Sequence, residues 1–107
     1  MITTIVNFTP PSAITLEDAT DLFEKGADNY RVVPGLIRKY YLLSNDGSTA
    51  GGVYLWESKE KADDFYNQEW LQLIEDKYHC KPIISYFQTP VIVDNFADSL
   101  IVERPKP

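Results

Sequence analysis

The stretch "GGVYLWES", residues 51–58, decides the fold expected for this chain. Its apolar and aromatic residues from Val53 to Trp56 favour a β-strand, on which Tyr54 and Trp56, two positions apart, share a face. Ser58 follows as a suitable N-cap, because its hydroxyl can accept a hydrogen bond from the first turn of a helix. The segment therefore predicts a strand that leads directly into a helix.

The same strand and helix signals recur on both sides of this stretch. Residues 2–8, "ITTIVNF", predict a first strand. Thr15 opens a capping box, and apolar residues spaced by three and four predict a helix that ends at Pro34-Gly35. The helix after Ser58 carries a second apolar side, with a break expected near Asn67. Two more strands are expected, in 36–45, "LIRKYYLLSN", and in 83–88, "IISYFQ".

The element order β-α-β-β-α-β predicts a single α+β domain, residues 1–107, with the ferredoxin-like fold and an antiparallel sheet. Tyr40 and Leu42 should project to one face of that sheet, and Tyr41 and Leu43 to the other. Both faces are then apolar, and helices cover only one of them. We therefore expect a homodimer, in which the apolar C-terminal segment 90–107 is exchanged with the second copy.

Composition narrows the possible functions. Ten basic and sixteen acidic residues give a net charge of −6, which argues against nucleic-acid binding. No apolar run approaches a membrane span, and no signal-peptide pattern is seen at the N-terminus. A single cysteine, Cys80, excludes an internal disulfide and fits a cytoplasmic protein. No His, Asp or Glu cluster has metal-ligand spacing, and "GSTAGG" precedes a strand, so neither a metal site nor a nucleotide loop is expected.

The segment 33–66, "VPGLIRKYYLLSNDGSTAGGVYLWESKEKADDFY", resembles the YdhR-like monooxygenases. The likeness is sharpest in "PGL", in the Lys39-Tyr40-Tyr41 run and in "GGVYLWES". These proteins belong to the dimeric α+β-barrel superfamily, which also holds the antibiotic-biosynthesis monooxygenases. The resemblance implies a cofactor-independent monooxygenase with a pocket between helices and sheet. Such an enzyme would deprotonate a small aromatic or polyketide-like substrate, which would then react with O₂.

Two alternatives stay open beside this interpretation. The same fold also serves non-catalytic small-molecule-binding and stress-response proteins. Haem-degrading members of the superfamily use an Asn on the first strand with a Trp and a His on the second helix. Asn7, Trp70 and His79 offer these residue types, but Trp70 and His79 are nine positions apart and out of register with that pattern.

Four residues are candidates for catalysis: Tyr54, His79, Lys39 and Asn7. Tyr54 and Asn7 could form hydrogen bonds with a substrate. His79 could act as a general base, or it could be a helix-end histidine favoured by the helix dipole. Lys39 could stabilise a phenolate or oxyanion, or its amine could reach to solvent.

Four further residues are candidates for substrate binding: Tyr41, Trp56, Phe65 and Trp70. Each is large and aromatic, so each could equally be part of the core. Because Tyr54 and Trp56 share a face, we expect both to line the pocket or both to lie in the core.

Overall fold

The computed structural model of the chain describes residues 1–105, which form three helices and six strands. The helices are α1 (Leu16–Tyr30), α2 (Lys59–Phe65) and α3 (Gln68–Tyr78). The strands are β1 (Ile2–Phe8), β2 (Leu36–Leu43), β3 (Ala50–Trp56), β4 (Ile83–Gln88), β5 (Val91–Asp94) and β6 (Ser99–Val102).

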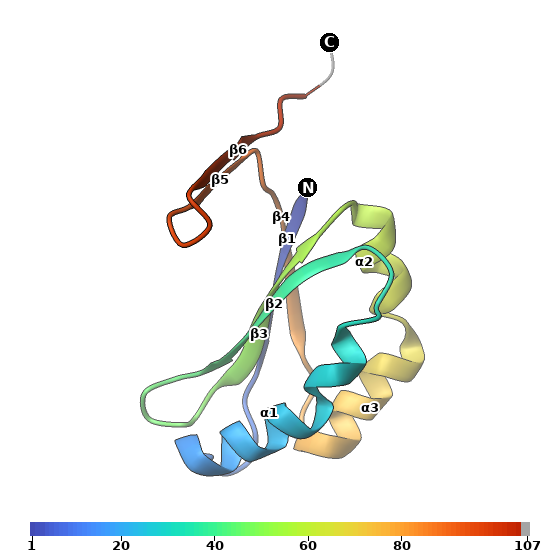
Figure 1. Cartoon of the computed structure of the whole chain (residues 1–107). Coiled ribbons are helices and arrows are strands. Elements are labelled where there is room, and N and C mark those ends of the chain that lie inside the picture. The colour runs from blue at the N-terminus through green and yellow to red at the C-terminus, as the bar shows by residue number, and fades with distance from the viewer. Residues whose placement is uncertain (106–107) are drawn as a thin grey trace.

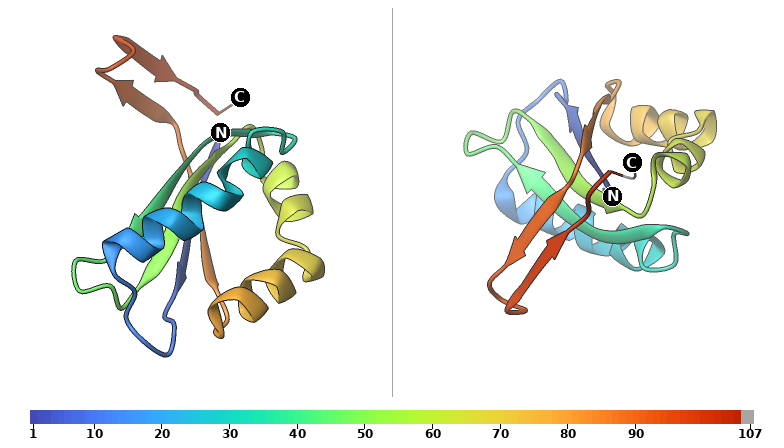
Figure 2. Two further views of the ribbon diagram at one scale, coloured as in Figure 1. Left: turned by 60° about the horizontal axis from the view of Figure 1, so that its bottom comes forward. Right: turned by 90° about the horizontal axis from the view of Figure 1, so that it is seen from above.

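The main sheet has the strand order β2-β3-β1-β4, and every neighbouring pair is antiparallel. With α1 between β1 and β2, and α2 and α3 between β3 and β4, this is the predicted ferredoxin-like arrangement. All three helices lie against one face of a twisted, curved sheet (Figure 1; Figure 2, left). The predicted fold class is therefore confirmed.

Each helix begins at a side-chain cap. The Thr15 hydroxyl accepts a hydrogen bond from the Asp18 N–H at 3.1 Å, and the Ser58 hydroxyl accepts one from the Lys61 N–H at 3.2 Å. Asn67 supplies a third cap, because its side-chain oxygen accepts the Trp70 N–H at 2.9 Å. α2 ends at Phe65, and a new helix, α3, begins after the Asn67 cap. The break predicted near Asn67 is therefore confirmed.

The core lies between the sheet and the helices and contains a hydrogen-bonded group of side chains centred on Thr4. Thr4 is completely buried on β1. Its hydroxyl accepts a hydrogen bond from Trp56 Nε1 at 3.0 Å and lies 2.6 Å from the Tyr66 hydroxyl. Because the polar atoms of Thr4, Trp56 and Tyr66 all have partners, this group can stabilise the core and hold α2 against β1 and β3.

The opposite face of the sheet is open and apolar. Tyr40 and Leu42 of β2 are 54% and 40% exposed there, and Phe87 of β4 is 51% exposed. Tyr41 and Leu43 turn toward the helices and are half-buried, which confirms the predicted alternation along β2. Within the described residues, nothing covers the open face.

Segment 90–107, expected to cross to a second copy, folds back on itself as far as it is described. β5 and β6 form an antiparallel hairpin that extends away from the main body (Figures 1 and 2). An ion pair between Arg38 of β2 and Asp94, at 3.1 Å, ties the hairpin to the open face. Residues 106 and 107 lie outside the described part of the chain. None of the helices described is long and apolar enough to cross a membrane.

Candidate active site

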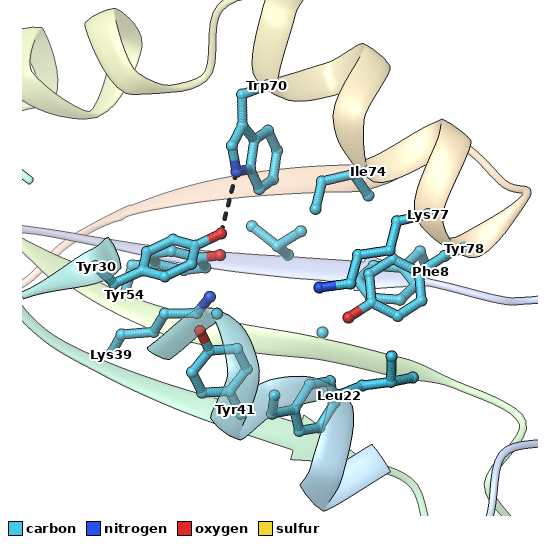
Figure 3. A pocket seen from close by; sticks show the side chains of 14 residues that line it. Phe8, Leu22, Tyr30, Lys39, Tyr41, Tyr54, Trp70, Ile74, Lys77 and Tyr78 are labelled. Atoms are coloured by element: carbon cyan, nitrogen blue, oxygen red, sulfur yellow. Dashed lines mark hydrogen bonds between the residues drawn. The ribbon is translucent and has the colours of Figure 1, made fainter. Parts of the chain in front are cut away.

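A small cavity of about 40 Å³ lies between the centre of the sheet and helices α1 and α3 (Figure 3). Every element around it contributes an aromatic or aliphatic side chain. The residues that line it are Val6, Phe8, Leu22, Phe23, Gly26, Tyr30, Lys39, Tyr41, Gly51, Tyr54, Trp70, Ile74, Lys77 and Tyr78.

Lys39 places its amine against three tyrosine rings. Its Nζ lies 3.3 Å from the centre of the Tyr30 ring, 3.7 Å from that of Tyr41 and 4.7 Å from that of Tyr54. β2 directs the side chain inward because Lys39 alternates with Arg38 and Tyr40, which face the open side. Of these two neighbouring basic residues, Lys39 therefore faces the helices and Arg38 faces the open side.

The electrostatics of the cavity favour a neutral amine. Burial, and secondarily the positive charge of Lys77, lower the pKa of Lys39 from its usual value to about 6. Lys77 approaches from α3, and the two side chains extend toward each other in Figure 3. The lining residues include these two lysines and no Asp or Glu. At neutral pH Lys39 is therefore largely a free base.

Tyrosine hydroxyls supply the remaining polar groups. The Tyr41 hydroxyl is buried and has no hydrogen-bond partner among the described residues. Burial raises the pKa of Tyr41 and of Tyr54 well above the usual tyrosine value, and it raises the pKa of Tyr78 to about 12. These phenols therefore stay protonated and can donate hydrogen bonds to a ligand oxygen.

Two glycines lie beside the lysine side chains. A Cβ at Gly52 of β3 would lie 3.3 Å from Lys39 Cε and 3.2 Å from the Tyr54 ring. A Cβ at Gly26 of α1 would lie 4.0 Å from Lys77 Nζ. A side chain at position 52 would therefore crowd Lys39, whereas a Cβ at position 26 would make only an ordinary contact with Lys77.

Trp70 separates the cavity from a larger open groove. It lines both the cavity and a groove of about 690 Å³ that includes Pro34, Phe65 and Leu73. Trp70 Nε1 donates a hydrogen bond to the Tyr30 hydroxyl at 3.2 Å, drawn as a dashed line in Figure 3. This bond joins α3 to the last residue of α1, across the boundary between cavity and groove.

Four of the residues predicted from the sequence meet at the cavity: Lys39, Tyr41, Tyr54 and Trp70. Phe65 lines the outer groove. Trp56 is completely buried beneath α2 and belongs to the core. Tyr54 and Trp56 stack with ring centres 6.0 Å apart, and both belong to the buried core, as expected for two residues on one face; Tyr54 also lines the cavity.

Asn7 and His79 lie away from the cavity. Asn7 is exposed and alternates with the inward-facing Val6 and Phe8, so it faces the open side of the sheet. His79 is an exposed left-handed C-cap of α3, with φ 60°, and its backbone N–H bonds to Glu75. Asn7, Trp70 and His79 are therefore not brought together as a haem-degrading triad would require.

Among the cavity residues with a polar side-chain group, three were not singled out as site candidates from the sequence: Tyr30, Lys77 and Tyr78. Tyr30 ends the apolar side of α1, where helical periodicity places it on the same side as Phe23. Lys77 and Tyr78 lie in the last turn of α3, and nothing in their local pattern separates a cavity lysine from a solvated one. Within residues 1–105, no cluster of His, Cys, Asp or Glu side chains could hold a metal ion.

Comparison with known proteins connects this geometry to a family. The sequence model described as "Putative mono-oxygenase ydhR" matches residues 5–80, more than half of the chain. No curated protein sequence matches the chain significantly.

Solved structures share the fold at low sequence identity. The monooxygenase ActVA-Orf6 of Streptomyces coelicolor, in complex with nanaomycin D, superposes with a TM-score of 0.64 and 18% identity, covering 86% of this chain and 89% of its own. SnoaB, a cofactor-independent oxygenase from Streptomyces nogalater, superposes with a TM-score of 0.60 and 14% identity, covering 82% of this chain and 91% of its own. A protein from Deinococcus radiodurans described as a "putative antibiotic biosynthesis monooxygenase" gives a TM-score of 0.64 and 11% identity, covering 88% of this chain and 97% of its own.

Proposed function

Because this chain belongs to the ydhR mono-oxygenase family, we propose that it oxygenates a small aromatic or polyketide-like substrate with O₂ and without a cofactor. The observation that carries the proposal is the buried, largely neutral amine of Lys39 in a cavity walled by aromatic rings. Such walls suit a flat aromatic ligand, and a free amine suits the removal of an acidic proton. Similarity of fold to a cofactor-independent oxygenase supports the same assignment.

The proposed reaction begins with proton transfer to Lys39. The neutral amine accepts a proton from a phenol or from a carbon acid beside a carbonyl, which leaves the substrate as an anion. The ammonium so formed, with Lys77 and the Tyr41 hydroxyl, stabilises that anion in a dry cavity. The anion then transfers electrons to O₂ and forms a peroxide. The Lys39 ammonium returns its proton to this peroxide anion. The hydroperoxide then loses water, made from its outer oxygen with the hydrogen on the same carbon, and one oxygen atom stays on the substrate as a carbonyl.

Substrate binding requires the cavity to open. Its volume of about 40 Å³ is far below the ~300–1,000 Å³ of typical ligand pockets. The groove beside Trp70 has the size of such a pocket, and the Tyr30–Trp70 hydrogen bond stands between the two. We therefore propose that breaking this bond lets the substrate pass from the groove to Lys39.

We also propose that the working form is a homodimer joined through the open face. The exposed Tyr40, Leu42 and Phe87 would be covered by a second copy, as an apolar sheet face requires. The β5–β6 hairpin carries exposed Val93 and Leu100, which could pack on the partner. In this proposed homodimer, the β5–β6 hairpin would be the element exchanged between the two copies.

Oxygen consumption with a panel of polyphenols and anthrone-like compounds tests the function. We expect uptake by the wild-type protein, a loss of at least about 100-fold in Lys39→Met and a smaller loss in Tyr54→Phe. Lys25→Met is the matched control, because Lys25 is exposed on α1 and does not line the cavity. Full activity of Lys39→Met would exclude the amine as the base.

The same panel distinguishes a catalyst from a non-catalytic binder. Fluorescence titration measures binding of each compound, with Trp70 as a reporter at the cavity. Compounds that bind without any oxygen uptake, across the whole panel, would favour the binding protein and would refute the oxygenase.

A further inference from the structure

Lys39 has the surroundings of a nucleophilic lysine as well as those of a base. Its amine faces a cavity with no carboxylate, and it takes part in none of the ion pairs found among residues 1–105. A lysine becomes nucleophilic when it is desolvated or lies near another cation. Both conditions hold here, because Tyr30, Tyr41 and Tyr54 cover the amine and Lys77 approaches from α3.

We propose that Lys39 Nζ forms a reversible imine with the carbonyl carbon of a small oxo acid whose carboxylate pairs with the Lys77 ammonium. This reaction goes beyond the oxygenase, since it consumes no O₂ and needs no aromatic substrate. The cavity of about 40 Å³ has room for roughly three water molecules, which is close to the size of pyruvate.

The reaction balances without a further reagent. The Lys39 lone pair attacks the carbonyl carbon, and one amine proton passes to the carbonyl oxygen to give a carbinolamine. The carbinolamine hydroxyl takes up the second amine proton and leaves as water when the C–O bond breaks, and the nitrogen forms the C=N bond. The Tyr41 hydroxyl, buried and without a partner among the described residues, can donate a hydrogen bond to the departing oxygen. No group is oxidised or reduced.

The charge around Lys39 sets the pH at which it reacts. The groups that face it are Tyr30 from α1, Tyr41 from β2, Tyr54 from β3 and Lys77 from α3, and Lys77 is the one cationic side chain among them. Burial and this charge lower the pKa of Lys39 to about 6. An exposed lysine with a pKa near ~10.4 is neutral only to roughly one part in 2,500 at pH 7.

Reductive trapping tests the proposal on the wild-type protein. The full chain is incubated without oxygen at pH 7 with pyruvate or with uncharged propanal, and cyanoborohydride converts any imine to a stable secondary amine. Peptide mass spectrometry then measures labelling at each lysine. We expect Lys39 to be labelled by pyruvate at least about tenfold faster than exposed Lys25 or Lys59. Its labelling rate should rise up to about pH 6 and then level off.

Two variants complete the experiment. Lys77→Gln should lower the pyruvate-to-propanal ratio at Lys39 at least about threefold, because the partner of the carboxylate is gone. Lys25→Met should leave labelling of Lys39 unchanged. Labelling spread over the exposed lysines with no preference for Lys39 would overturn the proposal, and so would an unchanged ratio in Lys77→Gln. Oxygen uptake plays no part in this readout, so the oxygenase and the imine can fail independently.

Discussion

Replacing Lys39 by methionine should stabilise the fold at neutral pH, although it removes the proposed catalytic base. Methionine keeps a long, unbranched side chain and can fill the same space among the tyrosine rings. Lysine, by contrast, must give up its proton to occupy this site, because its pKa falls to about 6 in the folded protein. Lys39 therefore lowers the stability of the fold while it supplies a free amine.

The magnitude follows from the two pKa values. An unfolded lysine titrates near ~10.4, so at pH 7 deprotonation costs up to about 4.6 kcal/mol, from about 3.4 pH units at ~1.36 kcal/mol each. The amine of Lys39 is covered by the rings, but the side chain as a whole keeps some contact with solvent, which reduces that cost, and the Tyr30 and Tyr41 rings favour the protonated form. We therefore expect Lys39→Met to raise the free energy of unfolding by about 2 kcal/mol at pH 7.

The way this stability difference changes with pH shows whether the lowered pKa of Lys39 causes it. Between about pH 6 and pH 10 the unfolded chain binds more protons at residue 39 than the folded chain does, so this lysine makes wild-type stability rise with pH. The loss of stability that Lys39 causes is greatest below about pH 6, and it disappears as the pH approaches ~10.4. The advantage of Lys39→Met should therefore shrink steadily across that window.

Guanidinium unfolding of the wild type, Lys39→Met and Lys25→Met, at one protein concentration and several pH values, measures these differences. Lys25 is exposed, so its variant should follow the wild type at every pH. A Lys39→Met protein that is less stable than the wild type at pH 7 would refute the reasoning. An advantage that is the same at pH 7 and pH 10 would also refute it.

Three other changes test separate parts of the structure. Tyr30→Phe removes the hydrogen bond to Trp70 and should speed ligand association about tenfold in stopped-flow fluorescence; an unchanged rate would argue against this bond as the barrier. Thr4→Val leaves the buried Trp56 N–H without its acceptor and should lower the free energy of unfolding by about 2 kcal/mol in thermal denaturation, whereas a loss near zero would mean that another group replaces Thr4. Leu42→Glu places a charge on the open face and should shift a dimer to monomer in analytical ultracentrifugation; a dimer of undiminished stability would locate the interface elsewhere.

Local sequence patterns determined most of the fold. Alternation along β2, the caps at Thr15, Ser58 and Asn67, and the apolar sides of the helices depend on neighbours within a few positions. Such features can be inferred before any long-range contact is known. The apolar character of both sheet faces could also be inferred, because strand alternation assigns side chains to faces directly.

Only part of the candidate site could be predicted from such local sequence patterns. Lys39, Tyr41 and Tyr54 could be proposed because they lie on strands whose inward direction follows from alternation. Asn7 was drawn into the candidate list by a family comparison, although strand alternation places it on the open face. His79 has the chemistry of a base, but its place at the end of α3 leaves it exposed.

The sequence by itself determined which elements form and which face of each strand is apolar, since both follow from propensity and period. Only the tertiary structure decided that Tyr54, which lies in the core with Trp56 on the same face, also lines a cavity. It also brought Lys77 of α3 toward Lys39 of β2, across 38 positions of chain. The physical reason is that a pKa and a cavity depend on how helices pack on a sheet. That packing brings together groups whose distance along the chain carries no information about their distance in space.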